Sequence, residues 1–391
     1  ISTINGFNFS GNGDRIGTVI VDTYEASPFK NLGMDNPNGS QRYYIGHVDW
    51  TGFNGLVEYT GSDQFSAVLQ FGTSSQTYQW EGFYTAAPST KSRKITVDGG
   101  YIKGGANYRM NENSNIFFNV GQIMRPPSFD GVFPNADYDF EEADDITNES
   151  FTSFELGYGF ISSNFKANIN AYHTVWGDRT LRRSTSIDDQ GVRIIYDGVE
   201  QTHQGIEAEM TWYPSSRLRI RGMASIGDWK YSKNFDGDAY FIDNNQPAGT
   251  TGTLYLDGVK IGDAAQSVLY LGADYKLSSK LSMDLDIMSF DNLHGRFGPL
   301  DSEFNSANNR GSIKLPSWGT VDLGATYRFS LLGYDTTARL NINNLLDEEY
   351  LSQSQTNFHN DGGRTWNGVN VENQVYFGKG TTWNLGLNIR F

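Results

Sequence analysis

Five histidines are the side chains of this chain best suited to hold a metal or transfer a proton near neutral pH: His47, His173, His203, His294 and His359. None has a second histidine at the His-x-x-x-His spacing that brings two imidazoles onto one metal. The chain has no cysteine, so thiolate ligands and disulfides are excluded. The acidic run 137–145 lacks the glycine hinge and the ligand spacing of an EF-hand. We therefore expect no dedicated metal site and no cofactor.

Catalysis is not indicated either, because the sequence contains no Gly-x-Ser-x-Gly nucleophile elbow. The net charge of -15, with the 30 Lys and Arg scattered along the chain, disfavours nucleic-acid binding. Arg, Trp, Tyr and other side chains in the long loops and at the adjoining strand ends can instead bind an anionic or sugar-like ligand through charge-assisted hydrogen bonds and stacking. The candidate ligand contacts are Arg125, Phe129, Asp130, Phe133, Trp176, Arg179, Trp229, Tyr231, His294 and Arg296. Each of these side chains has the alternative role of bracing its own loop.

The elements that carry these residues show a two-residue hydrophobic period, which is the pattern of strands with one apolar face. Aromatic residues make up 14% of the chain and there are 44 glycines, a composition that favours strands and turns. The clearest alternating segments are 154–160, 165–171, 206–212, 281–287, 321–329 and 383–389. The apolar side could be the core of a soluble sandwich or the lipid-facing side of a barrel.

Connection lengths favour the barrel, because outer-membrane barrels alternate tight turns with long loops. Short turns are predicted at 111–113, 162–163, 214–216, 277–280 and 332–334. Long connections are predicted at about 125–150, 179–203, 230–265, 290–317 and 348–376. The sequence has no run of 18 apolar residues that could form a transmembrane helix. We therefore predict one all-β domain over 1–391, a transmembrane antiparallel up-and-down β-barrel with about 13 or 14 strands in this chain.

Three segments stand in order along the chain: NIFFNVGQIMRPPSFDGVFP from Asn115, NESFTSFELGYGF from Asn148, and LNINNLLDEEY from Leu340. Together they resemble motifs of the TonB-dependent outer-membrane receptors. The first segment is similar to the family's aromatic strand leading into Arg-x-Pro. NESFTSFELGYGF is similar to its Pro-Glu-x-x-x-x-Tyr-Glu-Leu-Gly-Tyr, with Asn148 in place of Pro and Phe154 in place of Tyr. LNINNLLDEEY at 340–350 is similar to its Asn-Leu-x-Asp-x-x-Tyr motif.

The resemblance implies a 22-stranded barrel around an N-terminal plug, energised by the TonB complex. Nothing near Ile1 resembles a plug or a TonB-contacting box, so we expect the chain to be the C-terminal portion of such a barrel, with the TonB complex acting through the missing plug. The implied function is outer-membrane uptake of a scarce nutrient, most simply an iron-siderophore chelate. The alternatives are a SusC-like importer of oligosaccharides or peptides with a surface lipoprotein partner, a passive channel of about 14 strands, and a soluble β-rich binding or adhesion protein.

The C-terminal segment WNLGLNIRF is predicted to be a closing strand in contact with outer-membrane lipid. Four residues are predicted to face the lumen: Asn384, Gly386, Asn388 and Arg390. They alternate with an apolar series that faces lipid. The apolar series is Trp383, Leu385, Leu387, Ile389 and Phe391. By resemblance, a terminal aromatic strand of this kind is recognised by the barrel-assembly machinery.

Overall fold

The computed structural model describes residues 2–4, 19–21, 44–82, 91–133, 142–143, 146–187, 190–241, 246–248, 252–298 and 301–390, of which 2–4, 19–21 and 182–187 are described by their backbone alone. Phe391 therefore lies outside the described residues. The chain forms two compact units. The first unit contains 1–52, 74–99 and 126–147, and the second contains 53–73, 100–125 and 148–391.

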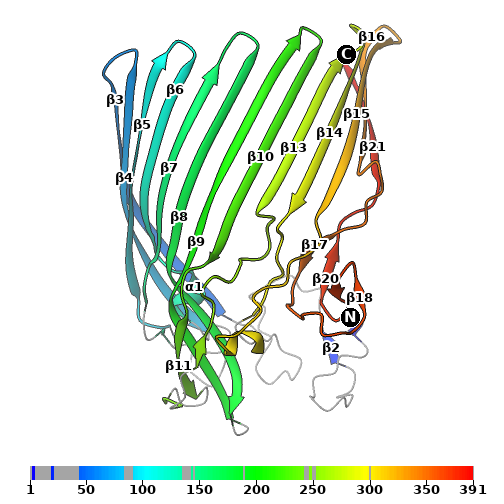
Figure 1. Cartoon of the computed structure of the whole chain (residues 1–391). Helices are drawn as coiled ribbons and strands as arrows, with labels where there is room; N and C mark the ends of the chain where they lie inside the picture. Colours follow the sequence, from blue (N-terminus) through cyan, green and yellow to red (C-terminus); the bar gives the residue numbers. More distant parts are fainter. Residues whose placement is uncertain are drawn as a thin grey trace. The chain divides into compact units, whose positions relative to one another are not determined.

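Thirteen strands of the described residues follow one path of hydrogen-bonded neighbours, almost in sequence order (Figure 1). They are β3 (Tyr44–Thr60), β4 (Phe65–Gly82), β5 (Ile95–Asn111), β6 (Ser114–Arg125), β7 (Glu149–Ile161), β8 (Phe165–Ile187), β9 (Gln190–Ser215), β10 (Leu218–Tyr231), β13 (Ser267–Lys276), β14 (Leu281–Asp291), β15 (Trp318–Leu331), β16 (Tyr334–Asn343) and β21 (Thr382–Arg390). Every pairing described along this path is antiparallel, for example β14 with β15. The predicted up-and-down order and the strand count are confirmed.

All five predicted short turns join neighbouring strands, at the ends of β5, β7, β9, β13 and β15 (Figure 1). A sixth short turn, between Thr60 and Phe65, was not predicted. Four predicted long connections are also present: 126–148, 232–266, 292–317 and 344–381. The predicted loop at 179–203 is wrong, because β8 and β9 continue as a paired hairpin to Ile187 and Gln190. Its run Arg193, Ile194, Ile195 and Tyr196 is strand sequence, since three of these residues are β-branched or aromatic.

The second unit's strands have one apolar and one polar face, and the register shows it directly. Residues paired across neighbouring strands share a face, and Ile220, Ala273, Leu285 and Leu323 pair in one row. Large side chains on this face are open, with Leu156 57%, Leu269 58% and Leu385 66% exposed. Leu385 pairs with Leu340 and Leu387 pairs with Ala338, so the apolar residues predicted for the closing strand share this face. Ile389 continues the series, while Trp383 pairs with Ile342.

The polar face carries ion pairs between strands. Arg221 lies 3.2 Å from Asp274 and 2.9 Å from Asp286, and Arg219 lies 2.9 Å from Asp274. Arg339 on β16 forms an ion pair with Asp284 on β14. Such side chains cannot face hydrocarbon without a large cost, so the two faces are built for different surroundings.

The long connections of the second unit have small cores of their own. The outer part of the β8–β9 hairpin packs with β11 (Phe235–Phe241), β12 (Thr253–Leu254) and the 3₁₀ helix η1 (Ser302–Asn305), burying Val192, Tyr196, Leu254 and Phe304. A second core joins Leu293, Leu315, Leu351 and Val369. The last connection also contains β17 (Leu351–Ser354), β18 (Thr365–Trp366), β19 (Val369–Asn370) and β20 (Val375–Phe377).

The motif LNINNLLDEEY, at the start of this last connection, holds the two ends of the connection together. Asn344 is buried, and its side chain accepts a hydrogen bond from the Glu348 N–H at 2.9 Å and donates to the carbonyls of Glu348 and Lys379 at 2.9 and 3.1 Å. Asp347 accepts from the Thr381 N–H at 2.8 Å. The ring of Tyr350 stacks on Trp318 with centroids 3.8 Å apart. The motif therefore ties the end of β16 to the start of β21.

The first unit has a separate core. It contains β1 (Ser2–Ile4), β2 (Val19–Val21), the outer parts of β3, β4 and β5, and α1 (Phe129–Val132). Tyr78, Trp80, Val132 and Phe133 are buried together. In the part of the chain that is described, neither helical element has the length and apolarity needed to cross a membrane.

Candidate functional site

A cleft of about 490 Å³ lies on the polar face of β7 to β10, toward the long connections. We call it the polar-face cleft. Its lining residues are Phe151, Ser153, Glu155, Asn170, Tyr172, Thr174, Trp176, His203, Glu207 and Trp229. Strand register explains why they meet, because Ser153, Thr174, His203 and Trp229 are paired in one row across four strands. Phe151 pairs with Trp176 in the next row.

Aromatic rings and guanidinium groups form the outer part of the cleft. Phe151 and Trp176 stack with centroids 5.0 Å apart. The guanidinium carbon of Arg179 lies 3.8 Å from the centre of the Trp176 ring, and that of Arg125 lies 5.3 Å from the Phe151 ring. A bulge between Trp176 and Arg179, with Asp178 at φ 57°, turns Arg179 over the ring. Cations over aromatic faces in this geometry are attractive.

The carboxylate of Glu149 connects Arg125 to Trp176. It pairs with Arg125 and accepts a hydrogen bond from Trp176 Nε1 at 3.2 Å. Arg125 and Glu149 are also direct cross-strand partners. The arginine of the Arg-x-Pro motif and the first glutamate of the second motif therefore form one pair that orders this end of β6 and β7.

Hydrogen-bonding groups occupy the inner part of the cleft. Glu155 accepts from Asn119 at 2.8 Å and from Asn170 at 3.0 Å, both neutral donors. Trp229 Nε1 donates to the Tyr172 hydroxyl at 2.9 Å, and its ring lies 5.6 Å from that of His203. The cleft thus offers stacking surfaces and cations outside, and carboxylates with amide partners inside. This combination suits binding of a planar or polar ligand.

Four of the ten predicted contact residues meet at this cleft: Arg125, Trp176, Arg179 and Trp229. Three others belong to the first unit. There Phe133 is fully buried, and Phe129 lies 5.0 Å from Phe133 and 6.0 Å from Tyr44 between ring centres, while Asp130 is exposed. The segment that follows Arg-x-Pro therefore packs into a core, and Tyr78 donates a hydrogen bond to the Pro127 carbonyl at 2.7 Å.

The last three predicted contacts lie among the long connections of the second unit. Tyr231 packs on Phe297 at 5.7 Å between ring centres. His294 is 8% exposed and lies 3.1 Å from Asn292 Oδ1 and 3.2 Å from the Ser312 carbonyl. Burial lowers the pKa of His294, which keeps the imidazole neutral at pH 7. Arg296 is more open and lies 3.6 Å from Asp263.

Sequence reasoning missed Phe151, Tyr172 and His203 as cleft residues. Counting in steps of two from Glu155 and Asn170 along the polar face reaches Phe151, Tyr172 and Trp176. The alternation could therefore have identified the first two. His203 depends on the register between β8 and β9, which the predicted loop at 179–203 concealed. Among the described residues no group of three or more acidic or histidine side chains is placed to hold a metal ion.

The exposed apolar face of the strands argues against the alternative of a soluble β-rich protein. Exposed Leu, Ile and Phe side chains continue from β6 to β21, far beyond the scattered apolar residues of a soluble monomer's surface. A soluble β-rich protein would bury such a face, so this alternative is wrong. The face has the composition of a lipid-contacting band.

Solved structures with the same fold are receptors and transporters about twice as long. The siderophore receptor PiuA from Acinetobacter baumannii matches at TM-score 0.64 and 14% identity, over 88% of this chain and 44% of that one. The ferric yersiniabactin uptake receptor FyuA from Yersinia pestis matches at 0.58 and 12%, over 89% and 47%. The copper transporter OprC matches at 0.57 and 13%, over 88% and 48%. No curated protein matches the chain.

These likenesses establish the fold, and the chain spans about half the length of the structures it matches. The sequence itself supplies the family. The profile described as "TonB dependent receptor-like, beta-barrel" matches residues 2–345. The chain therefore belongs to the TonB-dependent receptor β-barrel family of the bacterial outer membrane.

Proposed function

We propose that this chain is the barrel portion of a TonB-energised outer-membrane transporter that takes up a scarce nutrient, an iron-siderophore-type chelate. The observation that carries the proposal is the polar-face cleft. It combines stacked Phe151 and Trp176 with the guanidinium groups of Arg125 and Arg179, and these groups bind planar, oxygen-rich anionic ligands well.

The position of the cleft supports the same function. It lies toward the long connections, which are the extracellular side of barrels of this class. A ligand arriving from outside would meet the aromatic and arginine side chains first. The inner carboxylates Glu155 and Glu207 would then receive hydrogen-bond donors of the ligand.

The similar proteins of known structure favour a metal or its chelate as cargo. They include a siderophore receptor, a ferric yersiniabactin uptake receptor and a copper transporter. One fold therefore serves different cargoes, and the iron chelate is a proposal about this chain's own cleft.

The partners in this proposal follow the family. The TonB complex would supply energy through a plug domain lying outside these 391 residues, and the barrel-assembly machinery would recognise β21. A surface lipoprotein would be a partner only for an oligosaccharide or peptide importer. No step of the proposed function requires catalysis by this chain.

Uptake of radioactive iron tests the proposal. The full-length protein would be produced in iron-starved cells lacking other ferric receptors, and ferric catecholate, hydroxamate and citrate chelates would be supplied singly. We expect uptake of one chelate class that stops when the inner-membrane proton gradient is dissipated. Trp176→Ala should weaken binding about tenfold, corresponding to about 1.4 kcal/mol of lost stacking and cation–π interaction.

Two controls separate the alternatives. Phe358→Ala removes an exposed aromatic outside the cleft and should leave binding unchanged. Uptake that continues without the proton gradient would favour the passive channel. Uptake of oligosaccharides or peptides in place of every iron chelate would favour the SusC-like importer.

A further inference from the structure

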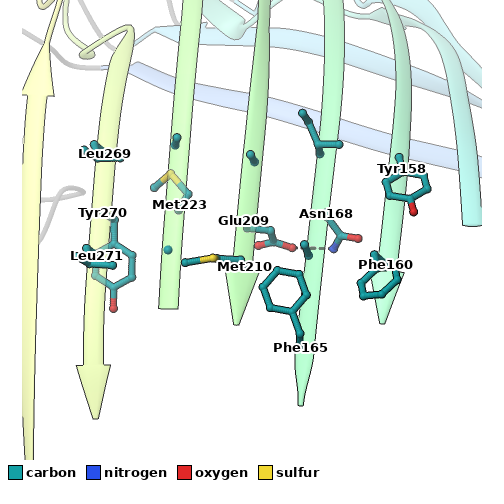
Figure 2. Close-up of a pocket in the computed structure, with 15 residues that line it drawn as sticks. Tyr158, Phe160, Phe165, Asn168, Glu209, Met210, Met223, Leu269, Tyr270 and Leu271 are labelled. Carbon is teal, nitrogen blue, oxygen red and sulfur yellow. Dashed lines mark hydrogen bonds between the residues drawn. The ribbon is translucent and has the colours of Figure 1, made fainter. Parts of the chain in front are cut away.

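We call the paired strands β6 to β10, β13 to β16 and β21 of the second unit the strand wall. A second cavity lies on the apolar face of this wall, opposite the polar-face cleft. This groove has a volume of about 660 Å³ and is lined almost entirely by apolar atoms of β7, β8, β9, β10 and β13. Figure 2 shows it with Tyr158 and Phe160 on one side and Leu269 and Leu271 on the other. We call it the lipid-face groove.

Two rows of paired residues explain its shape. One row reads Phe160, Ala167, Met210, Gly222 and Leu271 across the five strands, and the next reads Tyr158, Ile169, Ala208, Ala224 and Leu269. Both rows end in large side chains and contain alanine or glycine between them. The wall is therefore hollowed in the middle and raised at both sides.

Glycine at position 222 leaves room for the side chain of Met210 in this surface. A Cβ there would lie 3.1 Å from Met210 Cε and 3.2 Å from Met210 Cγ. Met210 therefore lies across the glycine and forms part of the groove's apolar lining. On the other face of the same strands, Asn168 and Glu209 form a hydrogen bond at 2.9 Å (Figure 2), so the polar groups point away from the groove.

The groove is continuous with the lipid-contacting face, which determines its occupant. Inside a bilayer there is no hydrophobic gain from covering an apolar wall, because the surrounding chains are equally apolar. Packing still matters, since an unfilled groove loses dispersion contacts along its whole lining. A flexible alkyl chain can fill a hollow with raised sides, and contacts on three sides hold it more tightly than a flat wall would.

The depth of the groove selects the leaflet. Ala167 lies three residues beyond Asn164 and Gly222 lies five beyond Arg217, both counted from short turns. At about 3.3 Å per residue and a strand tilt of about 40°, these positions lie roughly 8 to 13 Å from the turns along the membrane normal. The apolar band of such barrels is about 25 Å tall, and its short turns are periplasmic. The row that contains Ala167 and Gly222 therefore lies in about the periplasmic half, and the row that contains Ile169 and Ala224 lies two residues farther along the strands, at about the middle of the band.

We infer that the lipid-face groove is a binding site for an acyl chain of a periplasmic-leaflet phospholipid, retained by the barrel in preference to freely exchanging lipid. The site is separate from the polar-face cleft, since the two are on opposite faces. It does not depend on which cargo the transporter takes.

Native mass spectrometry of the full-length protein, extracted from outer membranes in mild detergent, tests this inference. Wild-type protein should retain one phospholipid. Ala224→Phe and Ala167→Phe fill the groove and should lower phospholipid occupancy at least fivefold. Ala171→Phe adds the same ring to the same face of β8 outside the groove and should keep wild-type occupancy. Folding of each variant is checked by heat-modified mobility.

Several outcomes would overturn the inference. These are no retained lipid on folded wild-type protein, equal occupancy in the filled and control variants, or retention of lipid A in place of phospholipid. A dimer that is lost only in the filled variants would show that the groove is instead an interface between two copies of the chain.

Discussion

The strand wall of the second unit and the long connections at its end follow different rules of stability. In the wall, a residue's surroundings depend on its parity along the strand, as with Leu385 on the apolar face and Asn384 on the polar face. In the connections, residues are held by specific partners distant in sequence, as Asn344 is held by Lys379. The wall is therefore tolerant within each face, whereas the connections depend on single side chains.

The difference arises from the solvent. Lipid satisfies any apolar side chain on the outer face, so Leu, Ile and Phe are interchangeable there. A connection outside the membrane must bury its own apolar residues and pair its own backbone groups. Phe304 and Leu254 do the first, and the Asn344 side chain does the second.

The largest predicted effect is Asn344→Ala in the last connection. It removes three side-chain hydrogen bonds at a buried position, and it places alanine at φ 49°, a left-handed conformation that asparagine tolerates better. We expect the unfolding free energy of the full-length protein in vesicles to fall by about 3 to 5 kcal/mol. Asn388→Ala, at an exposed position of β21, should change it little. Equal effects at the two sites would contradict the contrast between connection and wall.

The next effect belongs to the wall. Leu385→Arg places a charge on the lipid face and should destabilise the barrel by about 2 to 4 kcal/mol if the position is near the bilayer midplane. The adjacent Asn384→Arg points to the polar face and should cost less than about 1 kcal/mol. Urea titration of both variants in vesicles measures the difference. A greater loss for Asn384→Arg would reverse the assignment of the two faces.

The same contrast explains what the sequence could predict. Alternation and turn residues were sufficient for the strand order, because parity and tight turns are local properties. The 179–203 hairpin was missed because its strands extend beyond the lipid band and pack on β11 and η1, which are distant in sequence. At the site, Trp176 and Arg179 were found by residue type, whereas the burial of Phe133 and His294 depends on tertiary partners that no local pattern contains.

A smaller effect concerns the turn between β15 and β16. Leu332 and Gly333 are its two central residues, with φ 53° and 87°, the conformation of a type I′ hairpin that prefers Asn-Gly. Leu332→Asn should stabilise the protein by about 0.5 to 1 kcal/mol, because asparagine adopts positive φ with less strain. Leu331→Asn, one residue earlier in the strand, should give no gain. Thermal unfolding of the two variants compares them, and a gain from both would show that polarity alone is responsible.

The smallest effect is a pH dependence in the 292–317 connection. Arg310 pairs with the Glu303 carboxylate at 2.7 Å and donates its backbone N–H to it at 2.6 Å, which lowers the pKa of Glu303 from 4.5 to about 2. A carboxyl group with a lowered folded-state pKa stabilises fully above its unfolded pKa, and this contribution is lost as pH falls from about 4.5 toward 2. Because the pair is near the surface, solvent screening keeps the effect small and local. Hydrogen exchange at the Arg310 amide should therefore accelerate, relative to intrinsic exchange, over this interval in wild-type protein. In Glu303→Gln it should be faster at neutral pH and independent of this titration, whereas a persistent transition would assign the effect to another carboxyl group.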